Sequence, residues 1–127
     1  MSNADSMPLN IVGEPLESCC TNPVTGFFRD GYCRTIKQDS GLHTVCAQLD
    51  NEFLQFSLSK GNDLITPRPD FDFPGLKAGN RWCLCAMRWA EAWEANKAPR
   101  VLLRATHIKT LEVIPLEVLK QYAIDLN

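Results

Sequence analysis

Six cysteines in a chain of 127 residues constrain this fold more than any other feature of the sequence. Thiols can cross-link distant segments, bind a metal, react, or simply pack, and the redox environment decides between these roles. The first ten residues, MSNADSMPLN, contain neither a basic n-region nor an apolar h-region, so they do not predict a signal peptide. We therefore expect a cytoplasmic protein with reduced thiols rather than a disulfide framework.

The composition predicts one globular domain. Hydrophobic residues make up 45% of the chain and charged residues 22%, close to the averages for such domains. The net charge of −2 and the lack of a basic stripe predict no nucleic-acid partner. No apolar run approaches the length of a transmembrane helix, which predicts no membrane partner. We expect residues 1–8 to be a disordered or tag-like N-terminus and residues 9–127 to form the domain.

Turn signals and one well-marked helix dominate the first half of the chain. Residues 9–45 are rich in Asn-Pro, Asp-Gly and Ser-Gly steps, which predict loops with short strands. Residues 43–49 are partly β-branched and predict a strand. Asp50 suits the N-cap of a helix that Gly61 would end, with an apolar face between them.

The second half predicts a strand over residues 82–86 that runs into a helix. From Met87 the apolar residues recur at helical spacing, which places Trp89 and Trp93 on the buried face, and Pro99 lies beyond its end.

The remaining residues predict two strands and a last helix. The strands cover residues 100–106 and 110–114, and Pro115 suits the first position of the helix. The mixture lacks a βαβ rhythm. We therefore predict an α+β fold: a single two-layer domain with a small, mostly antiparallel sheet, about three helices and a loop-rich N-terminal third.

The spacing of Cys83 and Cys85 argues against a bond between them. On a strand the two side chains would share a face, but their Cα atoms would lie about 6.6 Å apart. Their Cβ atoms would be similarly spaced, whereas a disulfide needs roughly 3.5–4.5 Å between them. The C-x-x-C spacing of redox motifs is absent at this pair.

A zinc site is a further possible role for the cysteines. Structural zinc takes four Cys or His ligands, and this chain contains six Cys and two His, although C-x-C is a poor spacing for a zinc knuckle. The predicted metal ligands are Cys19, Cys33, Cys46, Cys83, Cys85 and His107. Packing is the alternative for each cysteine, since free Cys is among the most buried residue types.

A reactive thiol or an anion-binding pocket would use residues from the same segments. A nucleophilic cysteine needs a nearby cation, a histidine or a helix N-terminus. On this basis the predicted catalytic residues are Cys33, Cys83, Cys85, His107 and Asp30. The predicted ligand-binding residues are Arg29, Arg68, Arg81 and His43.

The loop over residues 62–80 is long for a compact domain, and such loops are often functional. It carries Arg68, Phe71 and Phe73 among several prolines and glycines. The alternative is that Phe71 and Phe73 only pin the loop onto the core.

Four long runs of the sequence combine these residues in unusual patterns. They are GEPLESCCTNPVTGFFRDGYC (13–33), GLHTVCA (41–47), GNDLITPRPDFDFPGLKAGNRWCLCAMRW (61–89) and ATHIKTLEVIPLEVLKQYA (105–123). In these runs the chain resembles the bacterial family catalogued as domain of unknown function 2237. The resemblance implies a small stand-alone α+β domain and no established activity, substrate or cofactor. The chain departs from the family pattern at Cys20, a weak site residue for that reason, and in the loop over 35–40.

Two hypotheses about function follow. The first is a protein that binds a small anionic molecule in a pocket lined by Arg, Cys and His, with the question of enzymatic activity open. The second is a metal-stabilised structural or protein-interaction domain, in which the cysteines serve ligation or packing.

Overall fold

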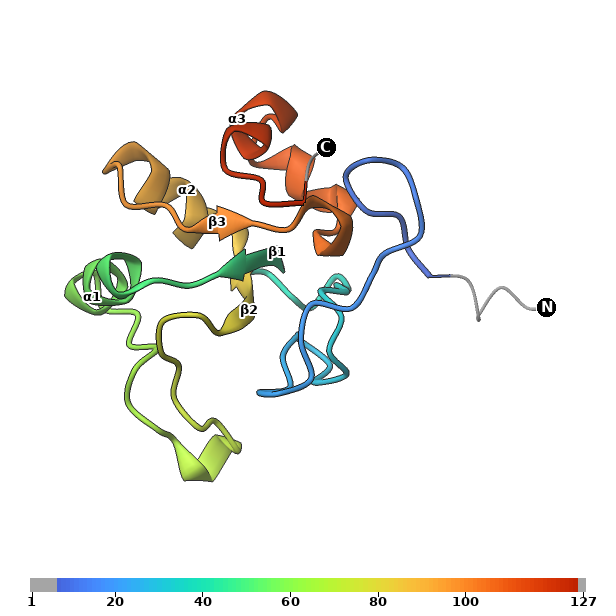
Figure 1. The fold of residues 1–127 in the computed structure, drawn as a ribbon. Coiled ribbons are helices and arrows are strands. Elements are labelled where there is room, and N and C mark those ends of the chain that lie inside the picture. Colours follow the sequence, from blue (N-terminus) through green and yellow to red (C-terminus); the bar gives the residue numbers. More distant parts are fainter. Residues whose placement is uncertain (1–6, 126–127) are drawn as a thin grey trace.

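A computed structural model describes residues 7–125 and shows an α+β domain built on three antiparallel strands (Figure 1). The strands are β1 (His43–Gln48), β2 (Arg81–Cys85) and β3 (Arg100–Val101), in the order β2-β1-β3. The helices are α1 (Asn51–Ser59), α2 (Ala86–Glu94) and α3 (Leu116–Gln121), and short 3₁₀ helices cover Pro69–Phe71, Leu103–Ala105 and Ile108–Glu112. The predicted fold class is confirmed.

The two faces of the sheet bury different kinds of side chain. In β1, Val45 and Ala47 pack into the main apolar core, whereas Cys46 belongs to a second cluster built from cysteines. In β2, Leu84 joins the main core and Cys83 lies opposite Cys46 in the strand register. This alternation follows from the period of two along a strand. It separates an aliphatic and aromatic core from a sulfur-rich one.

The ends of two helices follow the predicted capping chemistry in part. The Asp50 carboxylate accepts a hydrogen bond of 2.7 Å from the Phe53 N–H, and Gly61 follows the end of α1 with a φ of +86°. Both roles were predicted for α1. Pro115, however, is the N-cap of α3, one position earlier than expected.

The helix α2 begins directly after β2, as predicted, and is anchored by one tryptophan. Trp89 is fully buried, and its indole N–H donates to the Pro99 carbonyl at 3.1 Å. The expectation that Trp93 also anchors the helix is wrong, since 38% of Trp93 is exposed. Ala92 takes the buried position in the last turn, so Trp93 lies at the margin of the buried face.

The predicted strands near the C-terminus are largely wrong. Only Arg100–Val101 forms a strand, and 3₁₀ helices replace the expected strands further along. These turns are stabilised by side-chain hydrogen bonds to backbone N–H groups, which β-propensity does not take into account. The Asp125 carboxylate accepts from the Leu103 and Arg104 N–H groups at 2.8 and 2.9 Å, and His107 Nδ1 accepts from the Lys109 N–H at 3.0 Å.

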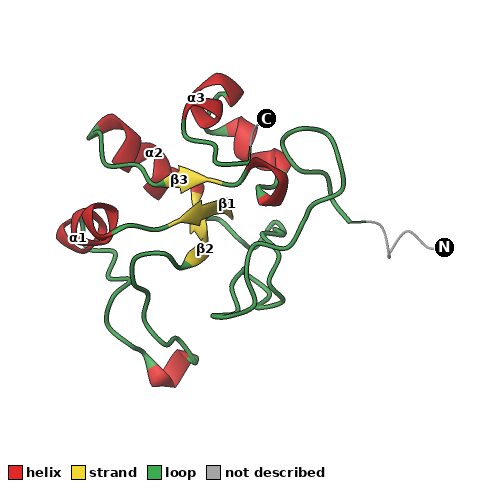
Figure 2. Cartoon of the chain, in the orientation of Figure 1, coloured by secondary structure: helices red, strands yellow, loops and turns green. Residues whose placement is uncertain are grey.

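The N-terminal third is loop-rich, as predicted, and packs along the C-terminal segment (Figure 2). Asn10 is fully buried, and its side chain accepts from the Val12 and Glu14 N–H groups and donates to the Arg104 carbonyl, each at 3.0 Å. Of the expected tag-like segment, residues 1–6 lie outside the described residues. Pro8 is described, and its carbonyl accepts a hydrogen bond from the Leu16 N–H at 2.9 Å.

The cysteines correct the expectation of reduced thiols. Cys19 is bonded to Cys46, and Cys33 is bonded to Cys83. The loops of the N-terminal third cover the cysteine-bearing face of the sheet, which brings each loop cysteine against a strand cysteine. Cys85 is a free thiol, so the prediction that it would not bond to Cys83 is confirmed.

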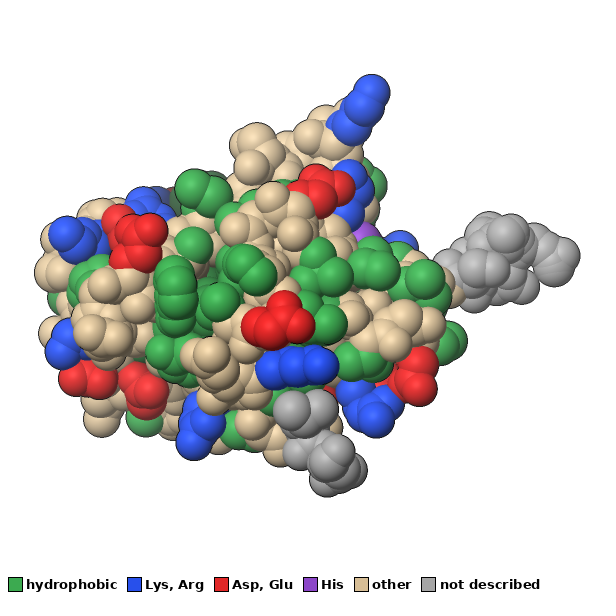
Figure 3. Space-filling view, turned by 90° about the horizontal axis from the view of Figure 1, so that it is seen from above, with side chains coloured by type: hydrophobic (Ala, Val, Ile, Leu, Met, Phe, Trp, Pro, Cys, Tyr) green, Lys and Arg blue, Asp and Glu red, His purple; other side chains and the backbone are tan. Residues whose placement is uncertain are grey.

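The surface mixes charges of both signs. Acidic and basic side chains lie beside one another on the face shown in Figure 3, with hydrophobic side chains between them. Among the described residues, no helix is long and apolar enough to cross a membrane.

Candidate functional site

A hollow of about 540 Å³ lies beside the edge strand β2. Four polar side chains from three separate segments line it. They are Arg29 from the N-terminal loops, His43 at the start of β1, and Asp63 and Arg68 from the long loop before β2. Three of the four predicted ligand-binding residues therefore converge on one hollow.

Aromatic rings form much of the wall of this hollow. Phe73 packs edge-on against Trp82, with 5.4 Å between the ring centroids. Phe27 stacks on the His43 imidazole at 6.4 Å. Phe71 also lines the hollow, and 65% of its surface is exposed. The hollow thus offers flat apolar surfaces beside its charged groups.

Arg29 is held over the aromatic wall. Its guanidinium carbon lies 5.1 Å from the Trp82 ring centroid, and its Nη1 donates to the Gly26 carbonyl at 2.7 Å. Within residues 7–125 Arg29 forms no salt bridge with a carboxylate. Because no carboxylate neutralises this guanidinium, its positive charge can still bind an anionic ligand.

The loop GFFRDG aims Arg29 by an uncommon backbone conformation. Arg29 has a φ of +54°, which is rare for a residue with a side chain and often occurs at functional positions. Gly26 has a φ of +103°, and a Cβ there would collide with the Tyr32 carbonyl. Asp30 does not neutralise Arg29, because its carboxylate pairs with Arg34 at 2.6 Å.

His43 is oriented by a buried aspartate. Its Nδ1 lies 2.6 Å from Oδ1 of Asp39, whose side chain is 1% exposed. Oδ2 of Asp39 also accepts from the His43 N–H and from Thr35 Oγ1, each at 3.0 Å. With an ionised Asp39, Nδ1 carries a proton and Nε2 is the nitrogen left for a ligand.

Asp39 was not among the site residues predicted from the sequence. The sequence does contain a pattern that could indicate this contact. An aspartate four residues before a histidine, within a Gly-containing turn, can bring its carboxylate back to that histidine.

Arg68 lies on the exposed tip of the long loop, which projects away from the sheet (Figure 1). The Arg68 N–H donates to the Phe73 carbonyl at 2.7 Å, which closes the tip. Its guanidinium pairs with Asp70 at 3.1 Å and lies 4.9 Å from the Phe71 ring centroid. Phe73 packs against the core while Phe71 is exposed, so of these two phenylalanines only Phe73 holds the loop against the core.

Asp63 adds a negative charge to the hollow. Hydrogen bonds from Thr66, and then from the Ile65 N–H, hold the pKa of the Asp63 carboxyl below its usual value. The backbone donors lie 3.1 and 2.9 Å from Oδ1. A charged acceptor beside two arginines favours a ligand that carries a hydrogen-bond donor as well as an anionic group.

A second, smaller hollow of about 190 Å³ adjoins the first, because His43 and Trp82 line both. It contains the free thiol of Cys85 and the side chain of Arg88. Cys85 is the cross-strand partner of His43 in the β1–β2 register. The predicted residue Cys85 thus lies at the margin of the site.

The other predicted site residues lie elsewhere or in another chemical state. Cys33 and Cys83 form a disulfide, so neither carries a free thiol, although Cys83 lines the larger hollow. Arg81 lines neither hollow. Asp30 pairs with an arginine outside the hollow, and His107 is buried at the start of a 3₁₀ helix.

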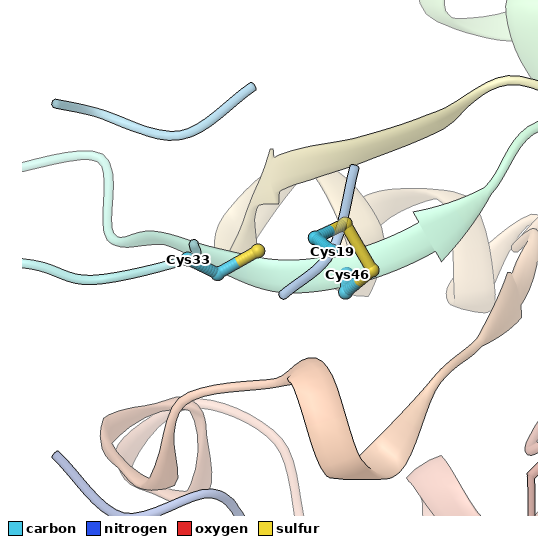
Figure 4. Close-up of side chains that lie close together, drawn as sticks. All are labelled: Cys19, Cys33 and Cys46. Atoms are coloured by element: carbon cyan, nitrogen blue, oxygen red, sulfur yellow. A yellow bond between two sulfur atoms is a disulfide. The ribbon is translucent and has the colours of Figure 1, made fainter. Parts of the chain in front are cut away.

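Three of the predicted metal ligands lie together. The sulfur atoms of Cys19, Cys33 and Cys46 are buried and lie within 4.8 Å of one another (Figure 4). The other predicted metal ligands, Cys83, Cys85 and His107, are not part of this group, although Cys83 is bonded to Cys33.

The family follows from a match over nearly the whole chain. The sequence profile of DUF2237 matches residues 9–123. The chain belongs to this family. Its description is "uncharacterized protein conserved in bacteria", so membership confirms the resemblance seen in the sequence runs and assigns no activity to this DUF2237 protein. No curated protein matches the chain.

Proposed function

We propose that this DUF2237 protein binds a small molecule with an anionic group and a flat apolar body in the hollow beside β2. The observation that carries the proposal is the convergence of Arg29, His43 and Arg68 on one aromatic-walled hollow from three segments of the chain. Ligand pockets commonly combine an apolar lining with a few convergent polar groups, and a volume of about 540 Å³ falls within their usual range.

Each part of the hollow has a distinct role in this proposal. Arg29 anchors the anionic group, since its charge has no carboxylate partner within residues 7–125. Arg68 contributes less, because Asp70 already neutralises part of its charge and both side chains are exposed. The rings of Trp82 and Phe73 accommodate the apolar body.

His43 and Asp63 restrict which ligands fit. The imidazole is fixed through Asp39, so its Nε2 offers a hydrogen bond in a defined direction. The Asp63 carboxylate repels a second anionic group and accepts from a hydroxyl or amino group. A monoanion with a donor group on a planar body therefore suits the hollow better than a polyanion.

A thermal-shift screen against aromatic carboxylates and phosphate monoesters tests the proposal. We expect at least one hydroxyl- or amino-substituted aromatic monoanion to raise the unfolding temperature of the wild-type protein. Arg29→Gln should weaken binding of that compound about tenfold or more, because a hydrogen bond to a charged group contributes about 1.5–3 kcal/mol.

Arg81→Gln is the matched control, because Arg81 lies on β2 but outside both hollows. It should leave the affinity unchanged. Equal losses of affinity in the Arg29 and Arg81 variants, or no response to any compound, would sink the proposal.

A further inference from the structure

The two disulfides lie together in one sulfur cluster and are not two separate cross-links. Cys46 and Cys83 face each other on neighbouring strands, and each is bonded to a cysteine from a different loop. The sulfurs of Cys19, Cys33 and Cys46 lie within 4.8 Å of one another, and the Cys33 sulfur points toward the Cys19–Cys46 bond (Figure 4). Cys83 is bonded to Cys33, so its sulfur completes the cluster.

The cluster is buried from solvent, and its two strand cysteines are held in position by hydrogen bonds. All four cysteines are at most 3% exposed, and Ala105 and Leu102 pack around them. The strand cysteines are held through their backbones: the Cys46 N–H donates to Thr106 Oγ1 at 3.1 Å and the Cys83 N–H donates to Thr25 Oγ1 at 2.8 Å.

Three of the four sulfurs have a spacing close to that of a tetrahedral zinc site. Zinc–sulfur bonds of about 2.3 Å place tetrahedral ligands about 3.8 Å apart. The sulfurs of Cys19, Cys33 and Cys46 already lie within 4.8 Å of one another. The Cys83 sulfur is attached to this group through its bond to Cys33, but it lies more than 4.8 Å from at least one of the other two sulfurs. Once the S–S bonds are broken, rotation of the side chains about χ1 can separate the bonded pairs and bring the Cys83 sulfur toward the other three.

We propose that reduction of the two disulfides converts this cluster into a binding site for one zinc ion. Each disulfide takes two electrons and two protons from a cellular dithiol or from two monothiols, which are oxidised to a disulfide in turn. The four resulting thiols of Cys19, Cys33, Cys46 and Cys83 release four protons as they bind Zn²⁺, giving a tetrathiolate site with a charge of 2−.

The fold gives reason for a metal to replace the disulfides. Residues 9–40 contain no α-helix and no strand of the sheet, and two cysteines in this region connect it covalently to β1 and β2. A zinc ion joins the same four segments, and the energy of structural zinc binding contributes directly to folding. The proposal is independent of ligand binding in the hollow beside β2.

Cobalt binding to the reduced protein tests the proposal. The full chain is reduced under anaerobic conditions, freed of reductant and metal, and titrated with Co²⁺. We expect one equivalent to produce the visible absorption of a tetrahedral tetrathiolate complex, and Zn²⁺ to bleach it. Oxidised protein should show none of this absorption.

Variants separate the cluster from the free thiols. Cys19→Ser and Cys83→Ser should each weaken metal binding by more than the roughly 10–100-fold loss that follows removal of an outer-shell partner. The double variant Cys20→Ser/Cys85→Ser should bind like the wild type, because these two thiols are free in the oxidised fold.

A second measurement covers the case in which the reduced, metal-free protein unfolds. Zn²⁺ should then restore the near-ultraviolet circular dichroism of the oxidised protein. The proposal is overturned if reduced wild type gives no tetrathiolate absorption, if the Cys20/Cys85 variant loses it, or if Zn²⁺ fails to refold an unfolded reduced chain.

Discussion

At the scale of single residues, the informative side chains are those that lack an ordinary partner or sit in an uncommon conformation. Arg29 combines a φ of +54° with a guanidinium that stacks on Trp82. The sequence predicts Arg29 as a binding residue from its type and its loop, and the structure places it in the hollow beside β2. It could not identify Asp39 as the partner of His43, because that contact depends on how the turn between them folds.

His107 gives a residue-scale prediction about pH. Burial, and secondarily the charge of Lys109, lower its pKa below the ordinary value of 6.5, while Glu112 opposes the shift. As the pH falls, the unfolded chain therefore binds a proton at His107 before the folded chain does. The contribution of neutral His107 to the free energy of unfolding is fully present above about pH 6.5. It is lost as the pH falls from there toward the lower pKa of the folded state.

Urea unfolding between about pH 8 and pH 5 measures this contribution. His107→Asn keeps a side-chain acceptor at the start of the 3₁₀ helix but does not titrate. The free energy of unfolding should fall less steeply with acidification in the variant than in the wild type. Identical slopes below about pH 6.5 would contradict this role of His107.

At the scale of elements, the sequence predicts best where the local signals are strong. The capping residues of α1 and the strand-to-helix junction at Ala86 were predicted closely. The C-terminal strands were not, because Asp125 and His107 stabilise 3₁₀ turns in a segment whose β-branched and apolar residues favour strands.

The disulfide pairings also could not be predicted from local sequence signals. Cysteine spacing in the sequence indicates that Cys83 and Cys85 do not bond to each other, but it cannot reveal which loop covers which strand. The pairings join residues 27 and 50 positions apart, so they depend on the tertiary fold. The cytoplasmic location expected from the N-terminus stays a prediction, and the redox state of these bonds in the cell bears on it.

Thiol counting with an alkylating reagent tests the pairing. In the oxidised protein, unfolded without reductant, two cysteines should react, Cys20 and Cys85, and all six should react after reduction. Peptide mapping should then find the other four in the pairs Cys19–Cys46 and Cys33–Cys83. Reaction at a third cysteine before reduction would contradict the pairing.

Stability should fall when the same bonds are reduced in the absence of metal. Closing loops of 27 and 50 residues is worth about 3.5 and 4 kcal/mol in a chain-entropy treatment, although the two loops overlap and the values do not simply add. We expect a loss of at least about 2 kcal/mol, with hydrogen exchange rising first in residues 9–40. An unchanged denaturation midpoint would contradict a stabilising role for the bonds.

At the scale of the whole molecule, the sulfur cluster and the hollow beside β2 adjoin each other. One face carries the sulfur cluster, which fastens the N-terminal loops to β1 and β2. The hollow lies where those loops meet the long loop before β2, and Cys83 belongs to both regions. The cross-links therefore support the position of Arg29 relative to His43 and Trp82. This arrangement combines distant segments, so sequence spacing alone could suggest its residues but not their convergence.

Amide chemical-shift mapping with salicylate, a hydroxyl-bearing aromatic monoanion, tests the central claim that this convergence is a binding site. We predict that the largest shifts fall on residues that line the hollow, namely Gly26, Phe27, Arg29, His43, Asp63, Leu64, Arg68, Phe71, Phe73, Trp82 and Cys83. Arg29→Gln should reduce these shifts at the same salicylate concentration. A separate hollow has a lining that includes Asn22, Gly75 and Asn80. Shifts centred on that hollow, or scattered evenly over the domain, would contradict the account.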